Sequence, residues 1–229
     1  MIEFDQLTNT KSVTTPTEVV SGTKQIALKI NICFDNQVVE GLYRPETGIL
    51  LTIDRRIPKP QELYRDVAYH RIDKFLGWNT SLPVIPWSLS EKDKGVIRPF
   101  FECASTFQDY QINEDLMGGE SDFWTRVALL DYVCGLIDRT YNDFLIFRSG
   151  DIKSLDSGLS FVEGRDFSYQ KSIIRELKKG DCVDNRHLID LQKLDPTSLE
   201  ALVGNLVDAA AIENVVERTR EIIKAGRII

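Results

Sequence analysis

The most constraining feature of this chain is an apolar helix that leads, through a polar turn, into a β-hairpin. Residues 121–137 carry apolar side chains at helical spacing, which predicts a helix that buries one face. The polar residues 138–143 then predict a turn, and the apolar residues 144–146 begin a short strand. A second strand ends at the tripeptide Asp156-Ser157-Gly158. This order predicts a hairpin directly after the helix.

The mouth of that hairpin gathers three aspartates. Asp138 and Asp143 lie in the turn, and Asp156 follows the second strand. Carboxylates in one place repel one another unless a cation lies between them. A magnesium ion that carries a nucleotide phosphate meets this requirement, because Mg²⁺ prefers carboxylate oxygens and keeps phosphate oxygens in its coordination shell. The hairpin mouth is therefore a candidate site for a metal and a nucleotide.

The segments before this helix predict an antiparallel sheet. Apolar alternation and turn signals indicate strands at 17–20, 25–34, 38–43 and 49–53, and extended segments at 82–87 and 95–101. One helix interrupts them at 58–77, where Gly77 ends it. Beyond the hairpin the pattern is helical at 168–179, 187–191 and 198–225, and Asp195-Pro196-Thr197 is typical of a helix start.

This order of elements predicts an α+β chain with a small antiparallel sheet first and a mainly helical part second. We expect a polar lead-in at 1–16 and a sheet part with one helix at 17–102. A linker at 103–120 would follow, because this segment is polar and carries two adjacent glycines. The helical part with the hairpin would occupy 121–229.

Composition argues against two classes of partner. A net charge of −7 disfavours nonspecific binding to nucleic acid or to an anionic membrane. The sequence shows no signal peptide and no apolar stretch long enough to span a bilayer, so we expect no membrane insertion. Its four cysteines lie far apart, which is typical of free thiols in a reducing compartment, and we expect a cytoplasmic protein.

The two motifs around the hairpin resemble those of the phosphatidylinositol 3-/4-kinase-like group, which includes compact bacterial kinases and relatives of the persistence-toxin kinases. In that group a helix ends in Gly-x-x-Asp-Arg, an Asn follows four residues after the Arg, and an apolar strand leads to Asp-x-Gly. This chain has the first motif at 135–139, Asp143 at the Asn position, and the last motif at 156–158. The resemblance covers residues 20–162 and implies a two-lobed protein-kinase-like fold, with a small antiparallel-sheet N-lobe and a mainly helical C-lobe.

The resemblance also implies a role for each residue of the hairpin mouth. Asp138 would be the catalytic carboxylate that orients or deprotonates an acceptor hydroxyl. Asp156 would hold Mg²⁺, or Mn²⁺ in its place, against the β- and γ-phosphates of ATP, and Asp143 would be the second metal ligand. Arg139 would order the catalytic loop rather than contact substrate. The implied activity is that of a kinase, which transfers the γ-phosphate of ATP to a hydroxyl group.

Weaker matches lie upstream, in the order that the group shows. Arg44 stands where the group has a phosphate-contacting Lys before a Pro, and Asp66 stands where it has the Glu that pairs with that Lys. The turn Ser21-Gly22-Thr23-Lys24 would form the loop over the phosphates. The strand at 97–101 would lead into the hinge behind the adenine.

Three departures from the group leave the activity open: Arg44 for Lys, Asp66 for Glu and Asp143 for Asn. Besides a kinase, the sequence is compatible with a pseudokinase or interaction module that holds nucleotide without turnover. A third alternative is an enzyme that transfers AMP. The part after Asp156-Ser157-Gly158 is short for the group, which favours a protein or small-molecule acceptor over a lipid.

Each motif also has a purely structural interpretation. Asp138-Arg139 would then be a helix end with a local ion pair, and Asp156-Ser157-Gly158 a turn capped by its aspartate. Arg44 and Asp66 would form a surface ion pair of little energetic weight.

Overall fold

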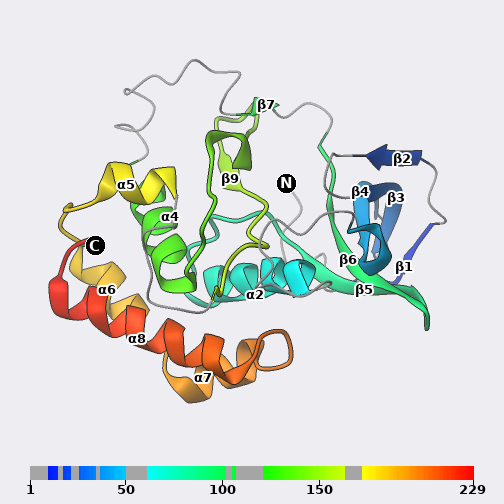
Figure 1. Cartoon of the computed structure of the whole chain (residues 1–229). Helices are drawn as coiled ribbons and strands as arrows, with labels where there is room; N and C mark the ends of the chain where they lie inside the picture. The colour runs from blue at the N-terminus through cyan, green and yellow to red at the C-terminus, as the bar shows by residue number, and fades with distance from the viewer. Residues whose placement is uncertain are drawn as a thin grey trace.

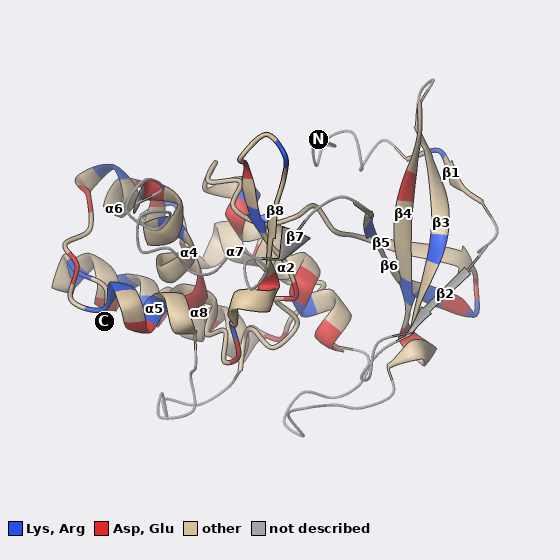
Figure 2. Ribbon diagram, turned by 90° about the horizontal axis from the view of Figure 1, so that it is seen from above, with Lys and Arg blue, Asp and Glu red and all other residues tan. Residues whose placement is uncertain are grey.

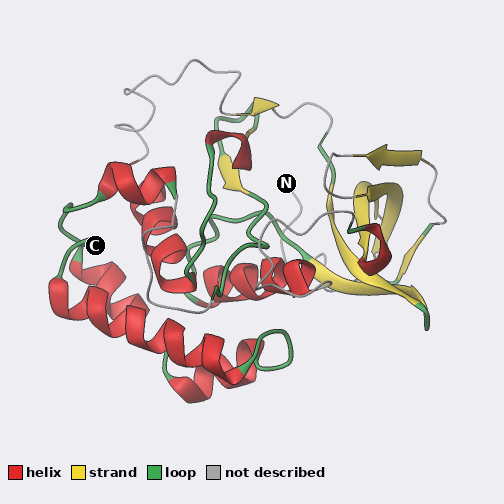
Figure 3. Ribbon diagram, in the orientation of Figure 1, coloured by secondary structure: helices red, strands yellow, loops and turns green. Residues whose placement is uncertain are grey.

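A sheet lies at one end of the molecule and a group of helices at the other, with helix α2 (Gln61–Phe75) between them (Figures 1 and 3). The structure is a computed structural model. It describes residues 10–14, 18–21, 26–34, 37–49, 61–101, 105–106, 121–162 and 172–229. The mixture of helices and antiparallel strands agrees with the predicted fold class.

The larger sheet has six strands and only antiparallel pairs among the described residues. Its strands are β1 (Ser12–Val13), β2 (Glu18–Ser21), β3 (Ile26–Phe34), β4 (Gln37–Pro45), β5 (Ile85–Ser90) and β6 (Asp93–Pro99). The order is β1-β3-β4-β6-β5, and β2 also pairs with β3. A 3-10 turn, η1 (Glu46–Gly48), follows β4.

The strand predictions are largely confirmed, with two corrections. The extended segment predicted at 82–87 begins only at Ile85, and the polar lead-in contains the unpredicted strand β1, which extends the sheet by pairing Ser12 with Cys33. The polar composition of the segment gave no sign of this strand. An edge strand is held by backbone hydrogen bonds to its neighbour and needs few apolar side chains. Of the strand predicted at 49–53, only Ile49 lies among the described residues.

The helices after α2 are α4 (Ser121–Cys134), α5 (Ile173–Lys178), α6 (Asn185–Leu191), α7 (Pro196–Val203) and α8 (Ala209–Ala225). The single helix predicted at 198–225 is wrong: the chain turns after Gly204, and Asp208 starts α8 by accepting the backbone N–H of Ala211. Asp195 caps α7, as predicted. No helix in the described ranges combines the length and hydropathy needed to cross a membrane.

A second, smaller sheet contains the predicted hairpin. It has the order β7 (Ser105–Thr106), β8 (Phe144–Ile146) and β9 (Ile152–Ser154), with a 3-10 turn, η2 (Tyr141–Asp143), before β8. Strand β7 lies inside the segment predicted as a linker, where it pairs with β8 through Ser105 and Ile146. That part of the linker is therefore ordered by backbone hydrogen bonds to the hairpin.

Helix α2 packs against both parts of the molecule. Its Leu63 and Val67 lie against Val96 of β6, in a small cluster with Ile49 and Val84. Farther along α2, buried apolar residues join the large core formed with α4, the hairpin and the C-terminal helices. This double packing fixes the helix that carries Asp66.

Candidate active site

Arg44 joins two aspartates that come from distant parts of the sequence. Its Nη1 donates to Oδ2 of Asp66 on α2 at 3.0 Å, and its Nη2 lies 3.6 Å from Oδ1 of Asp156. The side chains of Arg44 and Asp66 are only 6% and 8% exposed, whereas that of Asp156 is 59% exposed. The interpretation as a surface ion pair is therefore wrong, because the pair is buried. Figure 2 shows the charged ribbon segments around α2 and the hairpin.

The backbone around Asp156 is held against Asp66. Asp156 has a φ of 57°, in the left-handed region that non-glycine residues seldom adopt. The next residue, Ser157, donates its backbone N–H to Oδ1 of Asp66 at 3.0 Å. One carboxylate thus uses its two oxygens for different partners, and it fixes Arg44 and the turn at Asp156 together.

Other residues of α2 also contact this turn. Arg65 donates through Nη1 to the carbonyl oxygens of Ser160 and Phe161, both at 2.8 Å. A Cβ atom at Gly158 would lie 2.8 Å from the carbonyl oxygen of Glu62. The turn therefore needs glycine here because the α2 backbone comes so close.

Arg139 is buried behind Asp156. It donates through Nη1 to the carbonyl oxygen of Leu155 and through Nη2 to Oγ of Ser157, so it contacts the backbone and side chain on either side of Asp156. Its guanidinium also pairs with Asp131, with Nη2 3.1 Å from Oδ1. Arg139 is only 1% exposed and holds the two residues that flank Asp156.

Asp131 is a site residue that sequence reasoning missed. It lies on α4, is fully buried, and accepts hydrogen bonds from Tyr69 Oη at 2.6 Å and from Ser172 Oγ at 2.7 Å, besides those from Arg139. Burial and the nearby Asp131 carboxylate raise the pKa of Tyr69. A signal was present in the sequence, because Asp131 interrupts an apolar run of α4 and such a charge needs a partner.

Asp143 and Asp138 lie in the turn between α4 and β8. Oδ2 of Asp143 accepts the backbone N–H and the hydroxyl of Thr140, at 2.6 and 2.9 Å, and so caps η2. Burial raises the pKa of Asp143, and the negative charge of Asp156 raises it further. Asp138 is half-buried in the same turn.

Asp143 and Asp156 are the two residues predicted as metal ligands, and the structure describes both. They interact electrostatically, and both offer the carboxylate oxygens that Mg²⁺ prefers. Magnesium commonly takes one or two protein carboxylates and completes its shell with water and substrate phosphate. Within the described ranges, no group of three or more His, Cys, Asp or Glu residues could hold a metal ion.

Of the loop predicted to lie over the phosphates, the structure describes only Ser21. Ser21 ends β2 in a register opposite Ile26 of β3, and the segment Gly22-Thr23-Lys24 lies outside the described residues. Its role remains a prediction.

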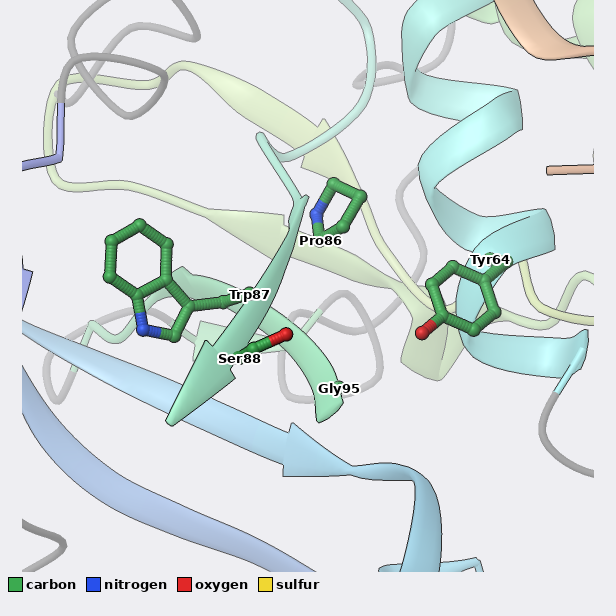
Figure 4. Close-up of a pocket in the computed structure, with 5 residues that line it drawn as sticks. All are labelled: Tyr64, Pro86, Trp87, Ser88 and Gly95. Atoms are coloured by element: carbon green, nitrogen blue, oxygen red, sulfur yellow. The ribbon is translucent and has the colours of Figure 1, made fainter. Parts of the chain in front are cut away.

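A separate pocket of about 270 Å³ lies between α2 and the β5–β6 hairpin (Figure 4). It is lined by Tyr64, Pro86, Trp87, Ser88 and Gly95. Neither Arg44 nor the aspartates that Arg44 contacts line this pocket.

The arrangement of the sheet, α2 and the hairpin is that of a protein-kinase-like fold. The chain is similar to the crystal structure of a Helicobacter pylori proinflammatory kinase, CtkA, with a TM-score of 0.53 and 12% identity over 95% of this chain and 93% of that chain. It is also similar to the Golgi casein kinase, with a TM-score of 0.51 and 12% identity over 90% of this chain and 70% of that one. No protein-family model and no curated protein sequence matches the chain.

Proposed function

We propose that this protein is a phosphotransferase that uses ATP and Mg²⁺ and transfers the γ-phosphate to a hydroxyl group. The observation that carries the proposal is the bridge from Arg44 to Asp66 and Asp156 on a protein-kinase-like fold. A guanidinium fixed by one carboxylate is suited to bind phosphate oxygens. The exposed carboxylate beside it is suited to bind the metal that accompanies them.

The proposed role of each residue follows from its position in the site. Asp156 and Asp143 would hold a Mg²⁺ ion, which would neutralise part of the phosphate charge. Arg44 orients the phosphates, Asp138 accepts the proton of the acceptor hydroxyl, and Arg139 keeps the turn at Asp156 in place. Phosphoryl transfer needs little covalent chemistry from a protein, so positioning and electrostatics are sufficient.

We further propose that the site lies between two lobes, 17–102 and 121–229, joined by the linker 103–120. Arg44 and Asp66 come from the first of these parts and Asp156 from the second. The motif spacing supports a relationship to the phosphatidylinositol 3-/4-kinase-like group. We favour a protein or small-molecule acceptor over a lipid, because the part after the Asp-x-Gly motif is short.

A nucleotide-binding pseudokinase is the second candidate, and one observation favours it. Each proposed metal ligand already uses one carboxylate oxygen within the protein: Asp156 with Arg44, and Asp143 with Thr140. Metal binding must therefore compete with these contacts or use the remaining oxygens, and competition weakens it.

Product analysis tests the proposal. The purified protein is incubated with ATP and Mg²⁺ or Mn²⁺, and ADP, AMP and ATP are quantified over time. Asp156→Asn removes the exposed carboxylate, and Asp151→Asn, an exposed aspartate of the same hairpin, is the matched control. ADP formation by the wild type and by Asp151→Asn, but not by Asp156→Asn, supports the phosphotransferase.

Each other outcome decides against that reaction. Metal-dependent thermal stabilisation by ATP without any product supports the pseudokinase. Release of AMP and pyrophosphate indicates nucleotidyl transfer. No product and no stabilisation overturns both proposals.

A further inference from the structure

Arg98 lies on the same face of the sheet as Arg44. Strands β4 and β6 are antiparallel, with Arg44 opposite Val96 and Leu42 opposite Arg98. Opposed residues and alternate residues along a strand share a face, so these four side chains lie on one side of the sheet. Val96 packs against α2, which shows that this is the side on which Asp66 lies.

The charges around Arg98 place it beside the candidate active site. Its guanidinium interacts electrostatically with Arg44, Asp66 and Asp156. Burial lowers the pKa of Arg98 and so does the charge of Arg44, whereas the two aspartates raise it. The positive charges of both arginines, Arg44 and Arg98, therefore interact with the same two carboxylates.

The two arginines differ in how their donors are used. Arg44 is held by both aspartates. Among the described residues, the half-buried guanidinium of Arg98 has neither a hydrogen bond nor an ion pair with another group. A guanidinium has five N–H donors, and no nitrogen of Arg98 is among the enclosed polar atoms that lack a partner, so these donors are accessible. Arg98 is thus a cation whose donors are available to an incoming anion.

We propose that Arg98 is a second phosphate-binding residue of this site and donates to the polyphosphate that Arg44 also contacts. The inference rests on the proposed nucleotide function. A triphosphate carries several negative charges, and Arg44 alone, already balanced by carboxylates, compensates little of that charge. Arg98 adds a planar donor pair suited to phosphate oxygens.

Calorimetric titrations with three probes test this inference: ATP, adenosine and inorganic tripolyphosphate, each with Mg²⁺. The variants are Arg98→Gln, which removes the charge, and Lys94→Gln, which makes the same change at an exposed position of the same strand. Arg98→Gln is expected to weaken binding of ATP and tripolyphosphate by about 10-fold to 100-fold, as for a charge-assisted hydrogen bond, and to leave adenosine unaffected. Lys94→Gln is expected to change none of the three.

Two outcomes overturn the inference. One is unchanged tripolyphosphate binding in Arg98→Gln, and the other is an equal loss for adenosine, which would mean that Arg98 only supports the fold. If Arg98→Gln does not fold, Arg98→Lys replaces it, because lysine keeps the charge but loses the planar fork; unchanged tripolyphosphate affinity then overturns the inference.

The inference and the proposed function can fail separately. If the protein forms no ADP but binds tripolyphosphate in a way that depends on Arg98, the proposed phosphate site stands and the proposed phosphotransferase activity is wrong. A wild type that binds neither ATP nor tripolyphosphate would remove both.

Discussion

Gly158 packs directly against the backbone of Glu62, so that a Cβ atom at position 158 would lie 2.8 Å from the Glu62 carbonyl oxygen. A non-bonded carbon and oxygen do not lie this close, so one of the two segments would have to move. The turn that carries Asp156 and the helix that carries Asp66 are therefore in contact through main chain. A shift of the turn is therefore expected to move α2, and a shift of α2 to move the turn.

Gly158→Ala is expected to push the turn away from α2 and to separate Asp156 from Arg44. ADP formation should fall at least about tenfold, because misplacement of about 1 Å near a reacting centre has large effects. The control is Gly77→Ala, just after α2, where the added methyl meets no atom within 4 Å but φ is +74°. That variant should lose about 1–2 kcal/mol of stability and keep its activity. Equal activity losses in both variants would contradict the argument.

Asp131→Asn is expected to be among the most destabilising single changes in the protein. It leaves the Arg139 guanidinium buried without its carboxylate, which costs about 3–5 kcal/mol of unfolding free energy. Tyr69→Phe removes only one hydrogen bond to the same carboxylate and should cost about 1 kcal/mol. Urea unfolding of the three proteins measures both values. A smaller loss for Asp131→Asn than for Tyr69→Phe would show that the carboxylate is dispensable.

Asp66→Asn and Asp156→Asn are expected to have the same effect on activity but different effects on stability. Both are expected to abolish ADP formation. Asp66 is buried against Arg44, so its neutralisation should cost about 3–5 kcal/mol, whereas that of the largely exposed Asp156 should cost about 1 kcal/mol or less. Thermal and urea unfolding provide the comparison, and similar losses for the two variants would argue against a buried Arg44–Asp66 pair.

The buried imidazole of His70 should make the protein acid-sensitive. Burial, together with the nearby cations Lys153, Lys74 and Arg71, lowers the pKa of His70 to about 3. In the unfolded chain a histidine takes up its proton near pH 6.5, so protons favour the unfolded state below that pH. Stability is therefore retained above about pH 6.5 and falls as the pH drops towards 3, by up to ~1.4 kcal/mol per pH unit from this group.

His70→Gln should show a shallower pH dependence. The free energy of unfolding is measured by urea titration at several pH values between about 7 and 4. The variant loses the Nδ1 contact to Ser81 and starts from a lower stability, so the slope is the informative quantity. Identical slopes in the two proteins would rule out His70 as the source of the acid sensitivity.

Local patterns in the sequence were sufficient for the hairpin and for α4, whereas the pairing of Arg44 with Asp66 was implied by the resemblance to a known family. Each of these depends on the spacing of neighbouring residues or on the order of motifs along the chain. The break between α7 and α8 was missed because an isolated glycine inside a helical pattern is a weak signal, and Asp208 shows its capping role only once the turn before it exists.

The sequence signals that Asp131 needs a partner, but the partners of Asp131 and Arg98 could not be assigned, for a different reason. Asp131 acquires its role from Tyr69 and Ser172, which belong to other helices or their ends, and Arg98 acquires its role from the register between β4 and β6. Contacts between distant segments determine both roles, and a single sequence does not record those contacts.

The bridge made by Arg44 also has a consequence for folding. It connects β4 to α2 and to the turn after β9, and Arg71 of α2 reaches still farther, to the carbonyl oxygen of Leu202 in α7. Contacts between such distant positions close large loops and slow the folding of a chain. Because the site needs all of these segments in place, a partly folded chain lacks it. A ligand that binds to the site therefore binds only the fully folded molecules and stabilises them.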